Sequence, residues 1–350
     1  MEQSPPIKYI QARAPIRICD NGGWTDTWFA GEGRVLNMAV SPLVEVQISV
    51  FRRGSLPAPV VFQVENYNDE YPFHPGVDEW ERHPLLEAAV TRLGIPDAYD
   101  CRIRLYSDAP GGGSMGTSAA VAVALVGALD LLTPGRMLPR QIAEHAHAVE
   151  TEMLQQQSGI QDQLAAVYGG INFIKITRFP NAEVHRLGLP EELLHALEAR
   201  LSLVYLGKAH SSSKVHEMVI QELENSGPAH PQIIALRQAA EAARESLLVG
   251  DLAAFGRSMT ANTAQQKMLH ADLVNAEARS IIEIAKTHGA AGWKVNGAGG
   301  EGGSLTLLSG PDMGAKRAML AEILQEDENY SIIPIRLEQA GLRRWDEKAL

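Results

Sequence analysis

The sequence predicts an α+β fold divided into two domains. Strand-forming runs dominate the first third of the chain and helical patterns follow them, without the regular strand–helix alternation of a doubly wound parallel sheet. The 350 residues allow one large domain or two ordinary ones. Two proline-containing turns near 180–190 mark a change in composition. We therefore expect an N-terminal domain over 1–185 and a C-terminal domain over 186–350.

Four runs predict the strands of the first domain, because they are rich in Val and Ile or alternate between apolar and polar residues. In the last run, Cys101, Ile103 and Leu105 would face a core while the two arginines between them face outward. The four runs are residues 7–18, 35–51, 58–65 and 100–106.

Helices follow these strands. The segment 119–132 is rich in Ala, Val and Leu and is stopped by a Thr-Pro-Gly turn. The segment 138–154 has a proline in its first turn and one apolar face, and a Tyr-Gly-Gly turn then leads into a strand at 171–176. In the second domain we expect strands at 201–206, 303–309 and 330–337, and helices near 211–225, 231–249, 251–288 and 312–325.

Charge and cysteine content exclude several classes of function. The 31 basic and 42 acidic side chains give a net charge of −11, which disfavours nucleic acid and anionic membranes as partners. Neither Cys19 nor Cys101 lies in a metal-binding pattern, and no signal peptide is visible. The most apolar stretch, 119–132, is too short to span a bilayer. We expect a cytoplasmic protein that binds a small molecule, and the sequence leaves open whether it forms a homodimer.

A glycine-rich loop at 109–120 is the strongest candidate for chemistry. Four glycines within six residues remove the Cβ atoms that would block an anion, and they let consecutive N–H groups turn inward where a helix starts. The hydroxyls of Thr117 and Ser118 could cap that helix or contact a metal ion bound to phosphate. The alternative is a tight turn with a hydroxyl cap. The candidate nucleotide-binding residues are Gly111, Gly112, Gly113, Ser114, Met115, Gly116, Thr117 and Ser118.

A second polar cluster follows the first strand. Arg17 is followed, within ten residues, by the carboxylates of Asp20 and Asp26 and by Trp24. A carboxylate such as Asp26 can accept hydrogen bonds from two vicinal hydroxyls, which suits a sugar. The alternative is a polar turn, with Arg17 in a surface ion pair and Trp24 in the core. The candidate substrate-binding residues here are Gly23, Trp24, Thr25 and Asp26.

Two acids and a further glycine run complete the candidates. Glu150 lies late in the 138–154 segment, and Asp162 begins a short helix. Taken alone, Glu150 would lie on a solvated helix face and Asp162 would be a helix N-cap. Six glycines in 292–303 indicate a loop packed against a ligand or another loop, or else a tight hairpin.

Three motifs together resemble the GHMP kinase superfamily: APIR…GGWTD at 14–26, PGGGSMGTSAA at 110–120 and KVNGAGGEGGS at 294–304. The resemblance covers most of the chain. It implies a two-domain fold, with an N-terminal S5-like α/β domain and a C-terminal ferredoxin-like α+β domain. Met115-Gly116-Thr117 stands where Leu-Gly-Ser is usual, and Glu301 interrupts the third glycine run.

The resemblance implies roles for the nucleotide side of the site. Residues 111–119 would cradle the phosphates of ATP. Thr117 or Ser118 would approach Mg²⁺, and Glu150 matches the carboxylate that binds this metal.

It also implies roles for the acceptor side. Asp162 matches the aspartate that faces the attacking hydroxyl, orients it and accepts its proton. Arg17 would stabilise the transferring phosphoryl group or keep Asp162 ionised. Asp26 matches the sugar-binding aspartate of the galactokinase-type first motif.

Within the superfamily, GGWTD and GIQDQLAAVYGGINFI are most similar to the sugar 1-kinase branch, which includes D-glycero-D-manno-heptose 7-phosphate kinase and the kinase part of fucokinase. This implies phosphoryl transfer from Mg·ATP to the anomeric hydroxyl of a sugar or sugar phosphate. Two alternatives are a catalytically silent sugar- and ATP-binding sensor, and a GHMP kinase that acts on a non-sugar alcohol. A sensor should lack the acid or the metal ligand, whereas Asp162, Glu150 and Arg17 are all present.

Overall fold

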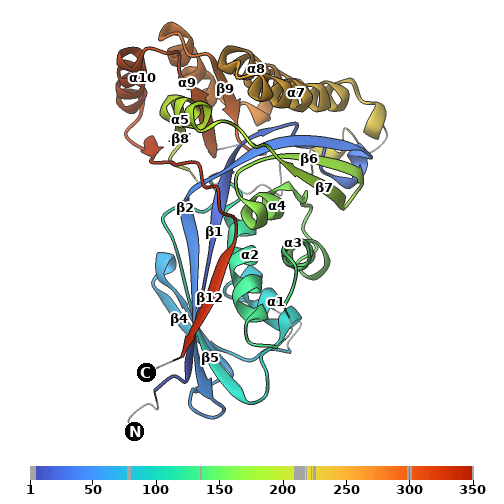
Figure 1. Cartoon of the computed structure of the whole chain (residues 1–350), viewed down its shortest axis with the longest axis vertical. Helices are drawn as coiled ribbons and strands as arrows, with labels where there is room; N and C mark the ends of the chain where they lie inside the picture. Colours follow the sequence, from blue (N-terminus) through green and yellow to red (C-terminus); the bar gives the residue numbers. More distant parts are fainter. Residues whose placement is uncertain are drawn as a thin grey trace.

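The computed structural model describes residues 5–76, 80–134, 136–208, 217, 219–221, 223, 226–297, 299 and 302–348. A large and a small β-sheet carry the helices, with the small sheet at the top of the view in Figure 1. The α+β class is therefore confirmed. The predicted division of the chain at 185/186 stays a prediction.

The large sheet is built around two long antiparallel strands, β1 and β2. Residues 44–50 of β2 alternate between buried and half-buried, as expected of a strand with one face on a core. The strand order is β12-β1-β2-β5-β3-β4, and β6 pairs with the first part of β2 and carries β7. The strands are β1 (Lys8–Asn21), β2 (Gly33–Arg52), β3 (Val60–Val64), β4 (Asp69–Phe73), β5 (Tyr99–Ser107), β6 (Ile171–Arg178), β7 (Asn181–Arg186) and β12 (Arg343–Lys348).

Helices α1 to α4 lie together on one side of the large sheet (Figure 1). Helix α2 packs on β1 and β2 and is flanked by the other three helices. It is therefore buried on almost every side, which explains its uniformly apolar composition. The helices are α1 (Pro84–Leu93), α2 (Thr117–Asp130), α3 (Pro139–Ala148) and α4 (Gln161–Tyr168).

The small sheet has the order β11-β8-β10-β9 and an apolar cluster of its own, including Ile281, Leu305 and Ile323. Helices α7 and α8 pack on each other, and they contact β2 and β9 respectively. No helix among the described residues is both long and apolar enough to cross a membrane. The elements are α5 (Glu191–Arg200), β8 (Leu201–Tyr205), α7 (Pro231–Leu248), α8 (Leu252–Leu269), α9 (Ala276–Thr287), β9 (Gly292–Val295), β10 (Ser304–Leu308), α10 (Met313–Glu326) and β11 (Ser331–Ile333).

Several expected elements need correction. The single helix at 251–288 is wrong, because the Asn275 side chain accepts the Ala278 N–H at 2.7 Å and starts a new helix, α9. The expected strand at 330–337 is confirmed only as β11, after which the chain returns to pair β12 with β1. The expected helix near 211–225 lies mostly outside the described residues. The sequence patterns also missed α1, β4, β7, α5, β9 and β12.

The predicted helix at 138–154 changes character along its length. The α-helix ends at Ala148, and one π-helical turn, Val149–Met153, continues it. The Leu154 N–H donates to the Val149 carbonyl at 3.1 Å, five residues back. Such turns frequently occur at functional sites, and Glu150 lies in this one.

Candidate active site

A cavity of about 780 Å³ lies between the glycine-rich loop, the end of β1 and the start of α4. Its volume is within the range of small-molecule sites. Most of the predicted site residues line it, whereas Gly23 and Thr25 do not. The predicted residues on the cavity wall are Arg17, Trp24, Asp26, Gly111 to Ser118, Glu150 and Asp162.

Arg17 and Asp162 form a two-pronged ion pair in this cavity. The guanidinium Nε and Nη2 donate to the two Asp162 oxygens at 2.7 and 3.0 Å. A third nitrogen of Arg17, Nη1, donates to the Ser114 carbonyl. Burial disfavours the charged guanidinium, but the carboxylates of Asp162, Asp20 and Asp26 outweigh it and raise the pKa of Arg17. Arg17 is thus a permanent cation that joins β1, the glycine-rich loop and α4.

The glycine-rich loop leaves the start of α2 open to the cavity. Gly116 is the N-cap residue in the left-handed conformation, and no side chain caps the helix. A Cβ atom at Gly116 would lie 3.2 Å from the Arg17 Cγ and 3.3 Å from the Asp162 carboxylate carbon, so a larger residue here would press on this ion pair. The first N–H groups of α2 are therefore available to an anion, and the alternative of a hydroxyl-capped turn is wrong.

Glu150 is buried at the cavity wall and is not on a solvated helix face. Its Oε2 accepts hydrogen bonds from the Ser158 hydroxyl at 2.9 Å and the Gln163 amide at 2.8 Å. Ser118 lies beside this carboxyl. Burial raises the pKa of Glu150 to about 7, with a further contribution from Asp162, although Ser158, Gln163 and Ser118 oppose the shift.

Asp26 links the first motif to α4. Its Oδ2 accepts the backbone N–H of Gln161 at 3.1 Å, so Asp26 satisfies the first N–H of the helix that carries Asp162. Burial and the nearby charge of Asp162 raise the pKa of Asp26 to about 7. The N-cap position of α4 is Ile160, so the alternative that Asp162 is itself the helix cap is wrong.

The other residues of the second motif shape the turn after β1. The Thr25 hydroxyl donates to the Gly22 and Arg34 carbonyls at 2.7 and 3.0 Å and accepts the Arg34 N–H. Gly23 donates its N–H to the Asp20 carbonyl at 3.0 Å. Trp24 packs in an apolar cluster with Phe29 and also lines the cavity. The alternative of a core tryptophan is therefore confirmed.

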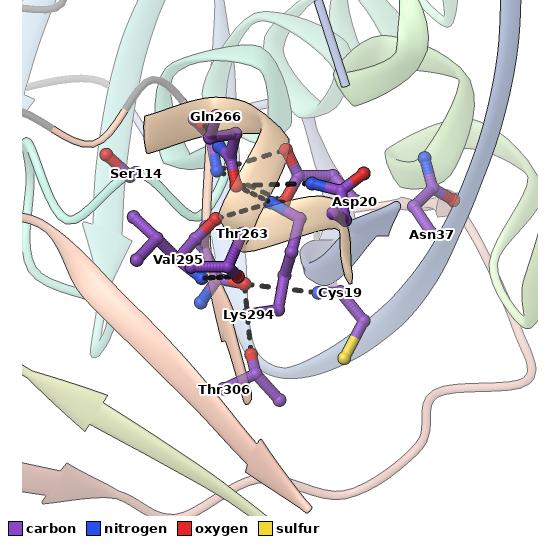
Figure 2. Close-up of polar contacts among 12 residues, drawn as sticks. Cys19, Asp20, Asn37, Ser114, Thr263, Gln266, Lys294, Val295 and Thr306 are labelled. Carbon is purple, nitrogen blue, oxygen red and sulfur yellow. Dashed lines mark hydrogen bonds and ion pairs between the residues drawn. The ribbon is translucent and has the colours of Figure 1, made fainter. Parts of the chain in front are cut away.

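The third glycine motif packs against the first motif through buried polar side chains (Figure 2). The fully buried ammonium of Lys294, on β9, donates to the Asp20 Oδ1 at 3.1 Å and to the Gln266 Oε1 at 3.0 Å. Burial lowers the pKa of Lys294. Burial would raise the pKa of Asp20, but Lys294 and Arg17 lower it overall.

Three side chains on or near the cavity wall escaped the sequence reasoning. Ser158 and Gln163 donate hydrogen bonds to Glu150, and both lie close to Asp162 in the sequence. Tyr67 lies at the cavity wall with its ring centroid 5.3 Å from that of His83. A serine, a glutamine and an isolated tyrosine carry no spacing signal that would have identified them.

Comparison with known families identifies this fold. The GHMP kinases N terminal domain matches residues 85–170, and the GHMP kinases C terminal domain matches residues 233–319. The chain belongs to the GHMP kinase family. The family resemblance and the two-domain GHMP kinase fold are thereby confirmed.

Individual relatives of this GHMP kinase support the assignment along the whole chain. A D-glycero-alpha-D-manno-heptose 7-phosphate kinase of Campylobacter jejuni is 23% identical over 97% of this chain and 99% of its own length. A bifunctional fucokinase/GDP-fucose pyrophosphorylase of Arabidopsis thaliana is 25% identical over 94% of this chain, which spans only 33% of that larger protein. The crystal structure of a D-glycero-D-manno-heptose 1-phosphate kinase from Bacteroides thetaiotaomicron superposes with a TM-score of 0.72 at 20% identity, covering 96% and 98% of the two chains.

The donors of this GHMP kinase fit a magnesium ion held mainly by phosphate. The described residues contain no cluster of three or more His, Cys, Asp or Glu that would bind a metal alone. Mg²⁺ typically keeps several waters and takes one or two protein carboxylates together with substrate phosphates. Glu150 and the Ser118 hydroxyl, which lie beside each other at the cavity wall, form such a partial set.

Proposed function

We propose that this protein is an ATP-dependent sugar kinase that phosphorylates the anomeric hydroxyl of a sugar or sugar phosphate. The observation that carries the proposal is the convergence of three groups on one cavity. These are the uncapped start of α2, the buried Glu150 carboxyl and the Arg17–Asp162 ion pair. Asp26 lines the same cavity. The heptose phosphate kinase and fucokinase relatives support a sugar as the acceptor.

The nucleotide side binds and orients the triphosphate. The N–H groups of residues 111–118 and the start of α2 face the phosphates, whose negative charge the helix terminus favours. Glu150 and Ser118 would hold Mg²⁺, with Thr117 the second hydroxyl candidate. This ion would supply positive charge that offsets the negative charge of the triphosphate.

The acceptor side orients the hydroxyl. Asp162 accepts a hydrogen bond from it and takes its proton, using lone pairs that Arg17 leaves free. Arg17 orients the Asp162 carboxylate through their two-pronged ion pair and neutralises charge on the phosphoryl group in transfer. Asp26 holds neighbouring sugar hydroxyls with its Oδ1, because its Oδ2 is occupied by the Gln161 N–H. Most of the catalysis then comes from positioning and charge neutralisation.

An ADP-release assay with a panel of sugars, sugar phosphates and mevalonate tests the proposal. We expect turnover with a sugar or sugar phosphate, and ³¹P NMR of the product should show an anomeric phosphate. Phosphorylation of mevalonate alone would favour the non-sugar alternative. Binding of Mg·ATP and sugar without ADP release would favour the sensor.

A further inference from the structure

The Lys294–Asp20 pair lies outside the roles assigned above, yet it is the most deeply buried ion pair among the described residues. The two side chains are 0% and 1% exposed. Moving two charges from water into the protein interior costs about as much free energy as their mutual attraction returns, so a buried ion pair of this kind contributes little to the stability of the fold. Its geometric consequences are a better guide to its role.

Two of the three partners of the Lys294 ammonium, Asp20 and Gln266, hold the same backbone residue, Gly297, and the third partner is the Val295 carbonyl. The two Asp20 oxygens accept the Gly297 N–H at 3.1 and 3.0 Å. The Gln266 Nε2 donates to the Gly297 carbonyl at 2.9 Å. The ammonium thus orients the Asp20 carboxylate, which accepts the Gly297 N–H, and the Gln266 amide, which donates to the Gly297 carbonyl (Figure 2).

Gly297 in turn lies against the glycine-rich loop, which is the proposed phosphate loop. A Cβ atom there would be 3.1 Å from the Ser114 carbonyl oxygen and 3.2 Å from the Arg17 Nη2. A parallel connection runs through Ser304, whose hydroxyl donates to the Gly113 carbonyl at 2.7 Å. The third glycine motif therefore contacts two successive residues of the glycine-rich loop, Gly113 and Ser114.

We propose that Lys294 is a positioning residue for phosphoryl transfer: through Asp20 and Gln266 it fixes Gly297 beneath Ser114, and so sets the phosphate loop and Arg17 at the distance that the nucleotide phosphates require. This inference rests on the proposed function, because it assumes that the loop binds ATP. Displacement of a reacting group by 1 Å can cost about 10²-fold in rate. Small shifts of Gly297 therefore matter even though Lys294 touches neither substrate.

The test compares Lys294→Met with the wild type and with Arg344→Met. Arg344 pairs with the buried Asp130 at the far end of α2, away from the cavity. Arg344→Met therefore also removes the partner of a buried carboxylate, but at a place that does not contact the site. Calorimetry with a non-hydrolysable ATP analogue and Mg²⁺ measures nucleotide affinity. Steady-state kinetics with the sugar identified by the panel give kcat and both KM values.

We expect Lys294→Met to weaken analogue binding and lower kcat by about tenfold or more, with the sugar KM changed by less than about threefold. Arg344→Met should lower the melting temperature and leave the kinetics unchanged. If Lys294→Met does not fold, the Asp20→Asn/Lys294→Met variant removes the unpaired charge and takes its place, with analogue binding still expected to weaken by at least about threefold. Wild-type analogue affinity and kcat in the folded variant would overturn the inference. Failure of the wild type itself to bind the analogue would instead overturn the proposed function.

Discussion

Replacement of Asp162 by asparagine is the sharpest test of the reaction proposed for this cavity. The asparagine keeps the size of the side chain and can still accept one hydrogen bond from Arg17, but it cannot take a proton. Loss of a general base costs about 10²–10⁴ in rate, or about 3–5 kcal/mol of barrier. We therefore expect kcat to fall by at least about a hundredfold, while the KM values for ATP and sugar change little.

The structure also sets the stability cost of this variant. Breaking a fully buried ion pair costs about 3–5 kcal/mol. The Asp162 side chain is 25% exposed, however, and Arg17 keeps the Ser114 carbonyl together with two other carboxylates nearby. We expect the free energy of unfolding to fall by about 1–2 kcal/mol and the melting temperature by a few degrees, which leaves the variant folded at the assay temperature.

The assay is coupled ADP release at saturating sugar and Mg·ATP, with thermal melting measured in the same buffer. Asp130→Asn is the matched control, because it weakens a buried pair with Arg344 that lies away from the cavity. That control should have a lower melting temperature than the wild type and an unchanged kcat. A folded Asp162→Asn protein that works within about threefold of the wild-type rate would refute the assignment of Asp162 as the base.

Three further substitutions test the other parts of the site. Gly111→Val places a branched side chain where, among the described residues, only the Tyr67 hydroxyl lies within 4 Å of the added Cβ, at 3.3 Å. ATP binding should therefore be lost with the fold retained, and unchanged ATP affinity would exclude phosphate binding at this position. Glu150→Gln should require a much higher Mg²⁺ concentration for activity. In the wild type, the Mg²⁺ concentration required should rise as the pH falls through about 7, where the Glu150 carboxyl of raised pKa becomes protonated. A pH-independent Mg²⁺ requirement would contradict a ligand role. Asp26→Asn should raise the sugar KM by about 10–100-fold, from the loss of charge-assisted hydrogen bonds worth about 1.5–3 kcal/mol each, and equal effects on the sugar and ATP KM values would indicate a folding role instead. Because the pKa of Asp26 is raised from 3.8 to about 7, its ionisation costs stability as the pH rises through that window, so at pH 8 Asp26→Asn should melt no lower than the wild type.

The glycine-rich loop was predictable from the sequence because its signal is local. Four glycines next to the apolar run of α2 require no knowledge of the remaining chain, and Gly116 does adopt the left-handed conformation that glycine permits. The convergence of Arg17, Glu150 and Asp162 was different. It came from the resemblance to a family, since 145 positions separate Arg17 from Asp162 and each residue alone has an ordinary structural explanation.

The buried lysine could not have been predicted in the same way. Lys294 lies 274 positions from Asp20, and a lysine in a short strand usually indicates a solvent-facing position. Likewise, β12 is a charged run without alternation, and it becomes a strand only because the edge of β1 is available to it. Pairings between distant parts of the chain leave no periodicity in either partner, so only the folded structure shows them.

The return of β12 to β1 has a consequence for how the polypeptide acquires its structure. During synthesis β1 leaves the ribosome long before residues 341–348 exist, so the edge of the large sheet is uncovered while the small sheet is being made. The late segment does more than cover that edge, because the Arg344 guanidinium reaches the Asp130 carboxylate at the end of α2 and the Leu342 N–H donates to the Val167 carbonyl. We therefore expect nascent chains that lack this segment to be protease-sensitive in residues 8–170, and to become resistant in one late step when it emerges.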